Sequence, residues 1–199
     1  MNLRSALLIL GSYLLGSIPF GVILGKLIVG VDVRAYGSGN TGATNVLRTL
    51  GFGFAFATFL LDAGKGAIVA YSARALMLPV AQVGMAGIAV VAGHDWPVFL
   101  GFKGGKGIAA TFGFLMVASP LVGLTFALVW LAVVVPTRYA SLGSIVASIA
   151  APIVAYFVTS SVQMPLACAV LAVLAVWRHR SNISRLLSGT ERKFGERVR

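Results

Sequence analysis

Charged residues are scarce in this 199-residue chain. Asp, Glu, Lys and Arg together make up 11% of it, whereas soluble domains average about 25%. Hydrophobic residues make up 58%, above the roughly 45–50% of soluble domains. The composition therefore predicts an all-α polytopic membrane protein, with a single transmembrane domain over residues 1–199 and no room for a separate soluble domain.

Cysteines and acids are scarcer still, and their scarcity limits the chemistry. The single cysteine, Cys168, lies in an apolar run, so the sequence offers neither a disulfide framework nor a Cys-based metal site. The five acids are too few and too scattered to build a Mg²⁺ cage. No G-x-S-x-G motif or Cys-His pairing points to a covalent acyl-enzyme. We therefore expect no metal and no cofactor.

Long apolar runs predict seven transmembrane helices. They cover residues 3–29, 52–73, 79–92, 106–118, 120–135, 141–158 and 164–177. A signal peptide is the alternative for the first run, but no small-x-small cleavage pattern follows and the run continues past Pro19. Ser119-Pro120 divides a thirty-residue run at Lys106–Val135, and the two halves are short for a ~30 Å hydrocarbon core.

Charge decides between six and seven spans. With seven, thirteen of the sixteen Lys and Arg residues lie on one side, including the seven of the tail 178–199. The positive-inside tendency then places the N-terminus outside, and the tail and all polar motif loops in the cytoplasm. We expect a multi-pass protein of the cell (inner) membrane. The net charge of +11 suits anionic lipids better than nucleic acid, which we do not expect as a partner.

The first polar segment runs from Tyr36 to Arg48. Gly37, Gly39 and Gly42 permit positive φ, and a helix starting near Thr41–Thr44 would point its amides at an anion. On that helix Arg48 can reach back beside Thr44. A simple N-cap and turn is the alternative. The candidate site residues of this segment are Ser38, Gly39, Asn40, Thr41, Thr44, Asn45 and Arg48.

The second polar segment is Gly93–Gly113. Its GFKGGKG is not a Walker A loop, because position 100 is Leu where that pattern needs Gly. A glycine turn, two lysines and a helix start at Gly107–Thr111 still make a phosphate cradle. The candidate ligands are Lys103, Gly104, Gly105, Lys106 and Gly107. Lys103 could instead only set topology, and His94 is expected to support or cap the third span.

The third polar segment is Trp177–Lys193. As one helix it would spread His179, Asn182 and Arg185 over about 120°, with Arg178 inside that arc. A histidine, an amide and two guanidiniums on one face suit a phosphate or a developing oxyanion. A basic stop-transfer tail is the alternative. Glu191 is expected to pair with an arginine of the tail.

One further pair, Asp62 and Lys65, lies inside the second span. At i and i+3 the two side chains can neutralise each other, as a structural ion pair or as a functional one. Taken alone, the residues predict a membrane protein that handles a phosphorylated, lipid-linked substrate from the cytoplasm. A transporter of a phosphorylated solute and a headgroup-binding scaffold are the rival hypotheses.

Three segments resemble the signature motifs of a bacterial enzyme family, the integral-membrane acyl-phosphate:glycerol-3-phosphate acyltransferases. They are SGNTGATNVLR at Ser38–Arg48, GHDWPVFLGFKGGKG at Gly93–Gly107 and HRSNISRLLSGTE at His179–Glu191. The DAGKG at Asp62–Gly66 is similar to the family's second span. The resemblance implies seven spans, with the motifs in the cytoplasm.

The resemblance also implies an activity: acyl transfer from acyl phosphate to the 1-hydroxyl of sn-glycerol 3-phosphate, giving lysophosphatidic acid and phosphate. Lys106 and Gly104, Gly105 and Gly107 would bind the phosphate of glycerol 3-phosphate. Ser38 and Arg48 would hold the acyl phosphate, and His179 and Asn182 would orient the hydroxyl or support the oxyanion, with Arg185 adding charge. Asp62, Lys65, His94 and Glu191 would be structural or supporting. We expect membrane lipids as surroundings and a functional monomer.

Overall fold

The computed structural model describes residues 3–196, and every regular element in that range is a helix. The α-helices are α1 (Leu3–Gly16), α2 (Phe20–Leu24), α3 (Ala43–Leu50), α4 (Phe52–Ala75), α5 (Val80–Asp95), α6 (Ile108–Ala118), α7 (Pro120–Thr137), α8 (Ala140–Val158), α9 (Gln163–Arg178) and α10 (Arg180–Leu187). A π-helix, η1 (Gly25–Val29), and two 3-10 helices, η2 (Val33–Ala35) and η3 (Val98–Leu100), lie between them. The predicted all-helical class is confirmed.

Five segments of the described chain are long and apolar enough to cross a membrane. They are Leu3–Val29, Phe52–Ala75, Val80–Leu100, Pro120–Thr137 and Ala140–Val158. The other two predicted spans form the apolar helices α6 and α9, of 11 and 16 residues. A straight helix needs about 20 residues to cross a hydrocarbon core. All seven predicted runs are therefore apolar, but two are short.

The first apolar run is long enough to cross a membrane, as predicted, but its helix is interrupted. Helix α1 ends at Gly16, and α2 begins only after Pro19, which lacks the amide hydrogen that a helix interior needs. The carbonyls of Gly16 and Ile18 are left without helical partners. Both accept hydrogen bonds from Lys65 Nζ of α4, at 2.9 and 3.3 Å. The break is thus satisfied by protein, as membrane depth requires.

The predicted division at Ser119-Pro120 is confirmed. Helix α6 ends at Ala118, Ser119 is non-helical with φ −149° and ψ 87°, and Pro120 is the first residue of α7. Proline favours this first helical position because its missing N–H would be unpaired there anyway.

One core is shared by helices α4 to α9, with Val69, Val90, Phe114 and Leu115 among its fully buried members. Helices α4 and α6 pack closely because glycines face backbone. A Cβ on Gly66 or on Gly113 would overlap a carbonyl of the other helix. Small residues at helix interfaces are typical of membrane bundles.

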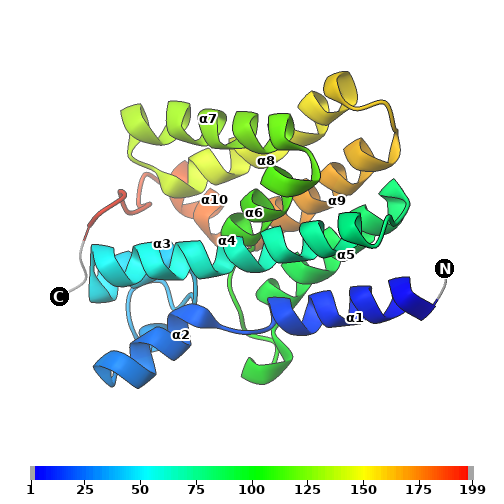
Figure 1. Cartoon of the computed structure of the whole chain (residues 1–199). Coiled ribbons are helices and arrows are strands. Elements are labelled where there is room, and N and C mark those ends of the chain that lie inside the picture. The colour runs from blue at the N-terminus through cyan, green and yellow to red at the C-terminus, as the bar shows by residue number, and fades with distance from the viewer. Residues whose placement is uncertain (1–2, 197–199) are drawn as a thin grey trace.

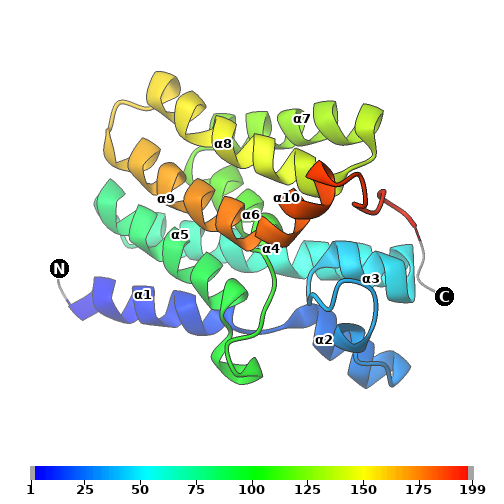
Figure 2. The ribbon, with the colours of Figure 1, turned by 180° about the vertical axis from the view of Figure 1, so that it is seen from behind.

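The long helices lie side by side, and the first and third polar segments gather at one end of them (Figures 1 and 2). Helices α2, α3 and α10 and the tail after α10 share that end in both views, while the start of α1 lies at the opposite end. The fold therefore brings together sequence segments more than 100 residues apart, as the contact between Arg48 and Arg192 shows.

Candidate active site

Asn45 organises the first glycine-rich loop. Its Nδ2 donates to the carbonyls of Val33 (2.8 Å), Asn40 (2.9 Å) and Tyr36 (3.3 Å). Its Oδ1 accepts from the amide and the hydroxyl of Ser38, at 2.8 and 3.1 Å. Predicted to bind substrate, this buried amide is instead fully engaged by its own loop. It fixes where the exposed Ser38 lies.

The backbone of this loop follows the prediction in part. Gly37 and Gly39 adopt positive φ of 63° and 70°. Gly42 does not, with φ −82°, because it is the extended N-cap residue of α3. The predicted helix start near Thr41–Thr44 is confirmed, since α3 begins at Ala43.

Arg48 of α3 turns toward the C-terminal tail rather than toward the loop. Its Nη2 donates to the carbonyl of Arg192 at 3.2 Å, whereas its buried Nε has no hydrogen-bond partner among the described residues. Burial lowers the pKa of this guanidinium from its usual value, and the Glu191 charge opposes that shift. Arg48 therefore offers a buried positive charge that is only partly paired.

The second glycine-rich loop is fastened on two sides. The amide of Gly105 donates to the carbonyl of His94 at 3.0 Å. Arg178, the last residue of α9, donates from Nε and Nη2 to the carbonyl of Gly105 at 2.9 and 2.6 Å, and from Nη2 to that of Gly104 at 3.0 Å. Gly107, with φ 68°, is the N-cap of α6, as the predicted helix start required. Lys103 is exposed on this loop.

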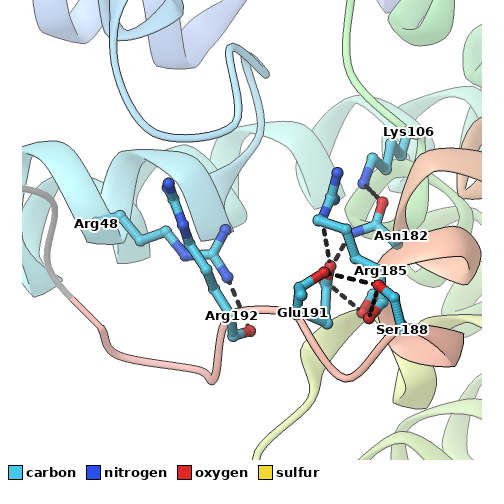
Figure 3. A network of polar contacts seen from close by, with 9 residues as sticks. Arg48, Lys106, Asn182, Arg185, Ser188, Glu191 and Arg192 are labelled. Carbon is cyan, nitrogen blue, oxygen red and sulfur yellow. Dashed lines mark hydrogen bonds and ion pairs between the residues drawn. The ribbon is translucent and has the colours of Figure 1, made fainter.

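Lys106 joins this loop to the third segment through a partly buried polar network (Figure 3). Its Nζ donates to Asn182 Oδ1, and Asn182 Nδ2 donates to Glu191 Oε1 at 2.6 Å. Glu191 also accepts from Ser141 Oγ at 2.7 Å and from Arg185 Nε at 2.7 Å. The predicted pairing of Glu191 with a tail arginine is confirmed. The orientation of the Asn182 amide is fixed, since an ammonium only donates and a carboxylate only accepts.

The charge of Lys106 is tuned by its surroundings. Burial, opposed by the Glu191 carboxylate, lowers the pKa of Lys106 to about 8. The lysine is thus still mainly protonated at neutral pH. Figure 3 shows Arg48 across from it, with no bond drawn between the two cations. Two cations on one side of the molecule form a positive region that can attract an anionic partner.

His179 is 3% exposed and lies between α9 and α10. Its Nδ1 donates to the carbonyl of Ala175 at 2.7 Å, because a carbonyl oxygen can only accept. Burial, together with the nearby Lys106 charge, lowers the pKa of His179 to about 4. The neutral ring therefore presents an unprotonated Nε2, which can accept a hydrogen bond from a hydroxyl group.

The segment 177–193 is not one helix, and that prediction is wrong. Helix α9 ends at Arg178, His179 has φ −95° and ψ 6°, and α10 stops at Leu187. The chain turns at His179, so Arg178 faces the loop at Gly104 while Asn182 faces Lys106. The side chains converge from two short helices rather than from one face.

The ion pair predicted within the second span is confirmed. Lys65 Nζ lies 2.8 Å from Asp62 Oδ1, and both side chains are buried. His94 joins them, with its Nδ1 2.8 Å from Lys65 Nζ and 3.4 Å from Asp62 Oδ1. It does not cap its helix, which continues to Asp95.

Residues 6–189 match the family model described as glycerol-3-phosphate acyltransferase. The glycerol-3-phosphate acyltransferase of Thermoanaerobacter pseudethanolicus is 47% identical over 94% of both chains, and that of Agrobacterium fabrum is 48% identical over 96% of this chain and 93% of its own. The chain belongs to the glycerol-3-phosphate acyltransferase family.

Solved structures of a related acyltransferase agree in fold. They are crystal structures of PlsY (YgiH), an integral membrane glycerol 3-phosphate acyltransferase, in its glycerol 3-phosphate and lysophosphatidic acid forms. This chain is 43% identical to them, with TM-scores of 0.92 and 0.89 over 96% of both chains. The present acyltransferase is thus an integral membrane protein, as predicted.

Two residues of this acyltransferase were absent from the predicted site. Arg178 was noted only as lying within the arc of a helix, yet it clamps the Gly104–Gly105 carbonyls. Ser141 was not predicted to be a site residue, yet its hydroxyl donates a hydrogen bond to Glu191. The basic residue that directly precedes the His179 motif was a usable signal for Arg178. No local signal marked Ser141, a serine at the start of an apolar run.

Proposed function

We propose that this acyltransferase transfers a fatty acyl group from acyl phosphate to the 1-hydroxyl of sn-glycerol 3-phosphate, the first step of phospholipid synthesis. The observation that carries the proposal is that the half-buried Lys106 ammonium binds Asn182 of the third motif, close enough to the neutral His179 of the same motif for its charge to lower the pKa of that histidine. The substrate-bound and product-bound forms of the related PlsY structures support the acceptor and the product.

The acceptor would be held by the second loop. Lys106 supplies a positive charge, and the Gly104–Gly107 backbone opens into the N-terminus of α6, whose free amides favour an anion. Asn182 and Glu191 keep Lys106 in place, and Arg185 keeps Glu191 in place. These contacts support a phosphate subsite for glycerol 3-phosphate.

The donor would be held by the first motif. Ser38 is exposed on a loop made rigid by Asn45, and Arg48 keeps an unpaired Nε. A hydroxyl and a guanidinium suit the phosphate of a mixed anhydride. Gly39, Asn40, Thr41 and Thr44 belong to the same segment.

The reaction needs no covalent enzyme intermediate, because the acyl phosphate is already activated. The 1-hydroxyl oxygen attacks the acyl carbon, the bond from that carbon to the phosphate oxygen breaks, and phosphate leaves. His179 Nε2 would accept a hydrogen bond from the attacking hydroxyl and orient it. With a pKa of about 4, His179 is a weak base. The phosphate that leaves is a much stronger base than this ring, so it is the better acceptor of the hydroxyl proton.

We further propose seven membrane crossings in one domain over residues 1–199, with the N-terminus outside and the site facing the cytoplasm of the cell membrane. Thirteen of the sixteen Lys and Arg residues then lie inside. The start of α1 and the described part of the tail after α10 lie at opposite ends of the helices, which supports an odd number of crossings (Figure 1). All of the proposed substrate-binding and catalytic residues belong to one chain, so a monomer would be sufficient for activity.

A direct assay tests the activity. The purified protein in detergent micelles is given acyl phosphate and labelled glycerol 3-phosphate, and labelled lysophosphatidic acid is measured. Product made without a sealed compartment supports the acyltransferase and rejects a transporter or a passive scaffold. No product would overturn the proposal. Acyl-CoA and acyl carrier protein serve as control donors and should be inactive.

A further inference from the structure

His94 is a buried polar side chain to which the proposed reaction gives no role. It is 7% exposed at the end of α5 and meets Asp62 and Lys65 of α4. Ionisable groups buried within membrane segments are costly, and such groups are functional candidates by default.

The hydrogen bonds that Lys65 donates determine which ring nitrogen of His94 carries the proton. Nζ donates to the carbonyls of Gly16 (2.9 Å) and Ile18 (3.3 Å) and to Nδ1 of His94 (2.8 Å), which uses all three ammonium hydrogens. Asp62 Oδ1 accordingly makes an ion pair at 2.8 Å without an aligned hydrogen bond among the described residues. Because an ammonium has no lone pair, Nδ1 of His94 accepts. Neutral His94 therefore carries its proton on Nε2.

The Nε2 edge of this ring lies against the phosphate-binding loop. A Cβ added to Gly105 would overlap Nε2 of His94. The amide of Gly105 also donates to the carbonyl of His94 at 3.0 Å, while Arg178 holds the carbonyl of Gly105 from the other side. The loop rests on the imidazole and is fastened to α9.

We propose that His94, locked by the Asp62–Lys65 pair, positions the Gly104–Gly107 loop for the phosphate of glycerol 3-phosphate, and that Gly105 is glycine because the imidazole fills the space of a side chain. The inference rests on the proposed function and explains what supports its phosphate subsite. His94 is a positioning residue, since it acts on the substrate through the loop.

A rival explanation for Gly105 is that the ligand itself needs the space. Glycines in phosphate loops commonly allow the anion to approach the backbone. Only the first explanation makes the cost of a methyl group at position 105 depend on the size of residue 94. Two double variants therefore separate the explanations.

Gly105→Ala alone should raise the KM for glycerol 3-phosphate about tenfold and leave the KM for acyl phosphate unchanged, because overpacking displaces the loop. His94→Asn removes the Nε2 edge and keeps a short polar side chain near Lys65, whereas His94→Gln reaches into the same space as the ring. Gly105→Ala with His94→Asn should recover most of the KM, and Gly105→Ala with His94→Gln should not. Losses that simply multiply in both double variants, or equal recovery in both, would overturn the proposal.

A measurement on the unsubstituted protein covers the case in which these variants fail to fold. The chain has two histidines, so ring-¹⁵N histidine spectra in micelles contain two sets of signals. His94 should show a protonated Nε2 and an unprotonated Nδ1, and Lys65→Met should abolish that preference. A proton on Nδ1 of His94 would overturn the proposal. Failure of the proposed function looks different, because the unsubstituted protein would then make no lysophosphatidic acid.

Discussion

The two histidines of the chain are both buried and both neutral, yet the Nε2 atom that each presents to the candidate site has the opposite hydrogen-bonding role. His94 accepts at Nδ1 from the Lys65 ammonium, and His179 donates from Nδ1 to the carbonyl of Ala175. The free Nε2 is therefore a donor in His94 and an acceptor in His179.

The difference shows that the group bound at Nδ1 determines whether Nε2 is a hydrogen-bond donor or an acceptor. His94 stands behind the Gly104–Gly107 loop, packed on Gly105, and can only support it. His179 stands beside Lys106, whose charge helps keep it neutral, and can receive a hydroxyl hydrogen. In the proposed function, His94 supports substrate binding and His179 takes part in the reaction.

The largest effect is expected when the His179 side chain is removed, because the contrast between the two histidines is then lost. His179→Ala should lower kcat about 10²-fold, because the attacking hydroxyl loses the acceptor that orients it. The KM of each substrate should stay close to its original value, since Lys106 and Arg48 are untouched. Steady-state kinetics with each substrate varied in turn measure this. Unchanged turnover would remove His179 from the reaction.

The next largest effect tests the role of the second loop in binding glycerol 3-phosphate. Lys106→Ala should raise the KM for glycerol 3-phosphate about 10–100-fold, the loss expected for a charged hydrogen-bond donor. The KM for acyl phosphate should change little. Lys106→Arg is the matched control, because it keeps the charge. Equal changes in both KM values would contradict the role given to the second loop.

The smallest effect lies in the pH dependence. The pKa of Lys106, lowered to about 8, means that its charge is lost as pH rises through 8 in the free enzyme. kcat/KM for glycerol 3-phosphate should fall about fourfold between pH 7 and 8.5. Lys106→Arg should remove this decline, and titration of the substrate cancels in the ratio of the two profiles. His179, with a pKa of about 4, should add no decline near its ordinary pKa of 6.5.

Features set by neighbours in sequence were predictable. Asp62 and Lys65 pair because they lie one helical turn apart, and Ser119-Pro120 ends one helix because proline can begin only the next. Pro19 should have predicted the break in the first apolar run by the same rule. The break was not predicted because the residues on both sides of Pro19 are apolar and together have the length of one membrane span.

Contacts between distant segments were not predictable in the same way. Lys106 and Asn182 are 76 residues apart, and Arg178 and Gly105 are 73 apart. Helical periodicity carries information over a few turns only, so it placed Asn182 and Arg178 on one face of a helix that in fact turns at His179.

The sequence by itself determined the membrane class, the apolar helices, the three polar motifs and their shared chemistry, because composition and short-range spacing specify each of these. Only the tertiary structure decided how the motifs divide their work. Which nitrogen of a histidine holds the proton depends on the group that faces the other nitrogen. For His94 that group is an ammonium 29 residues away on another helix. No local pattern encodes such a partner, since packing alone brings it within hydrogen-bond distance.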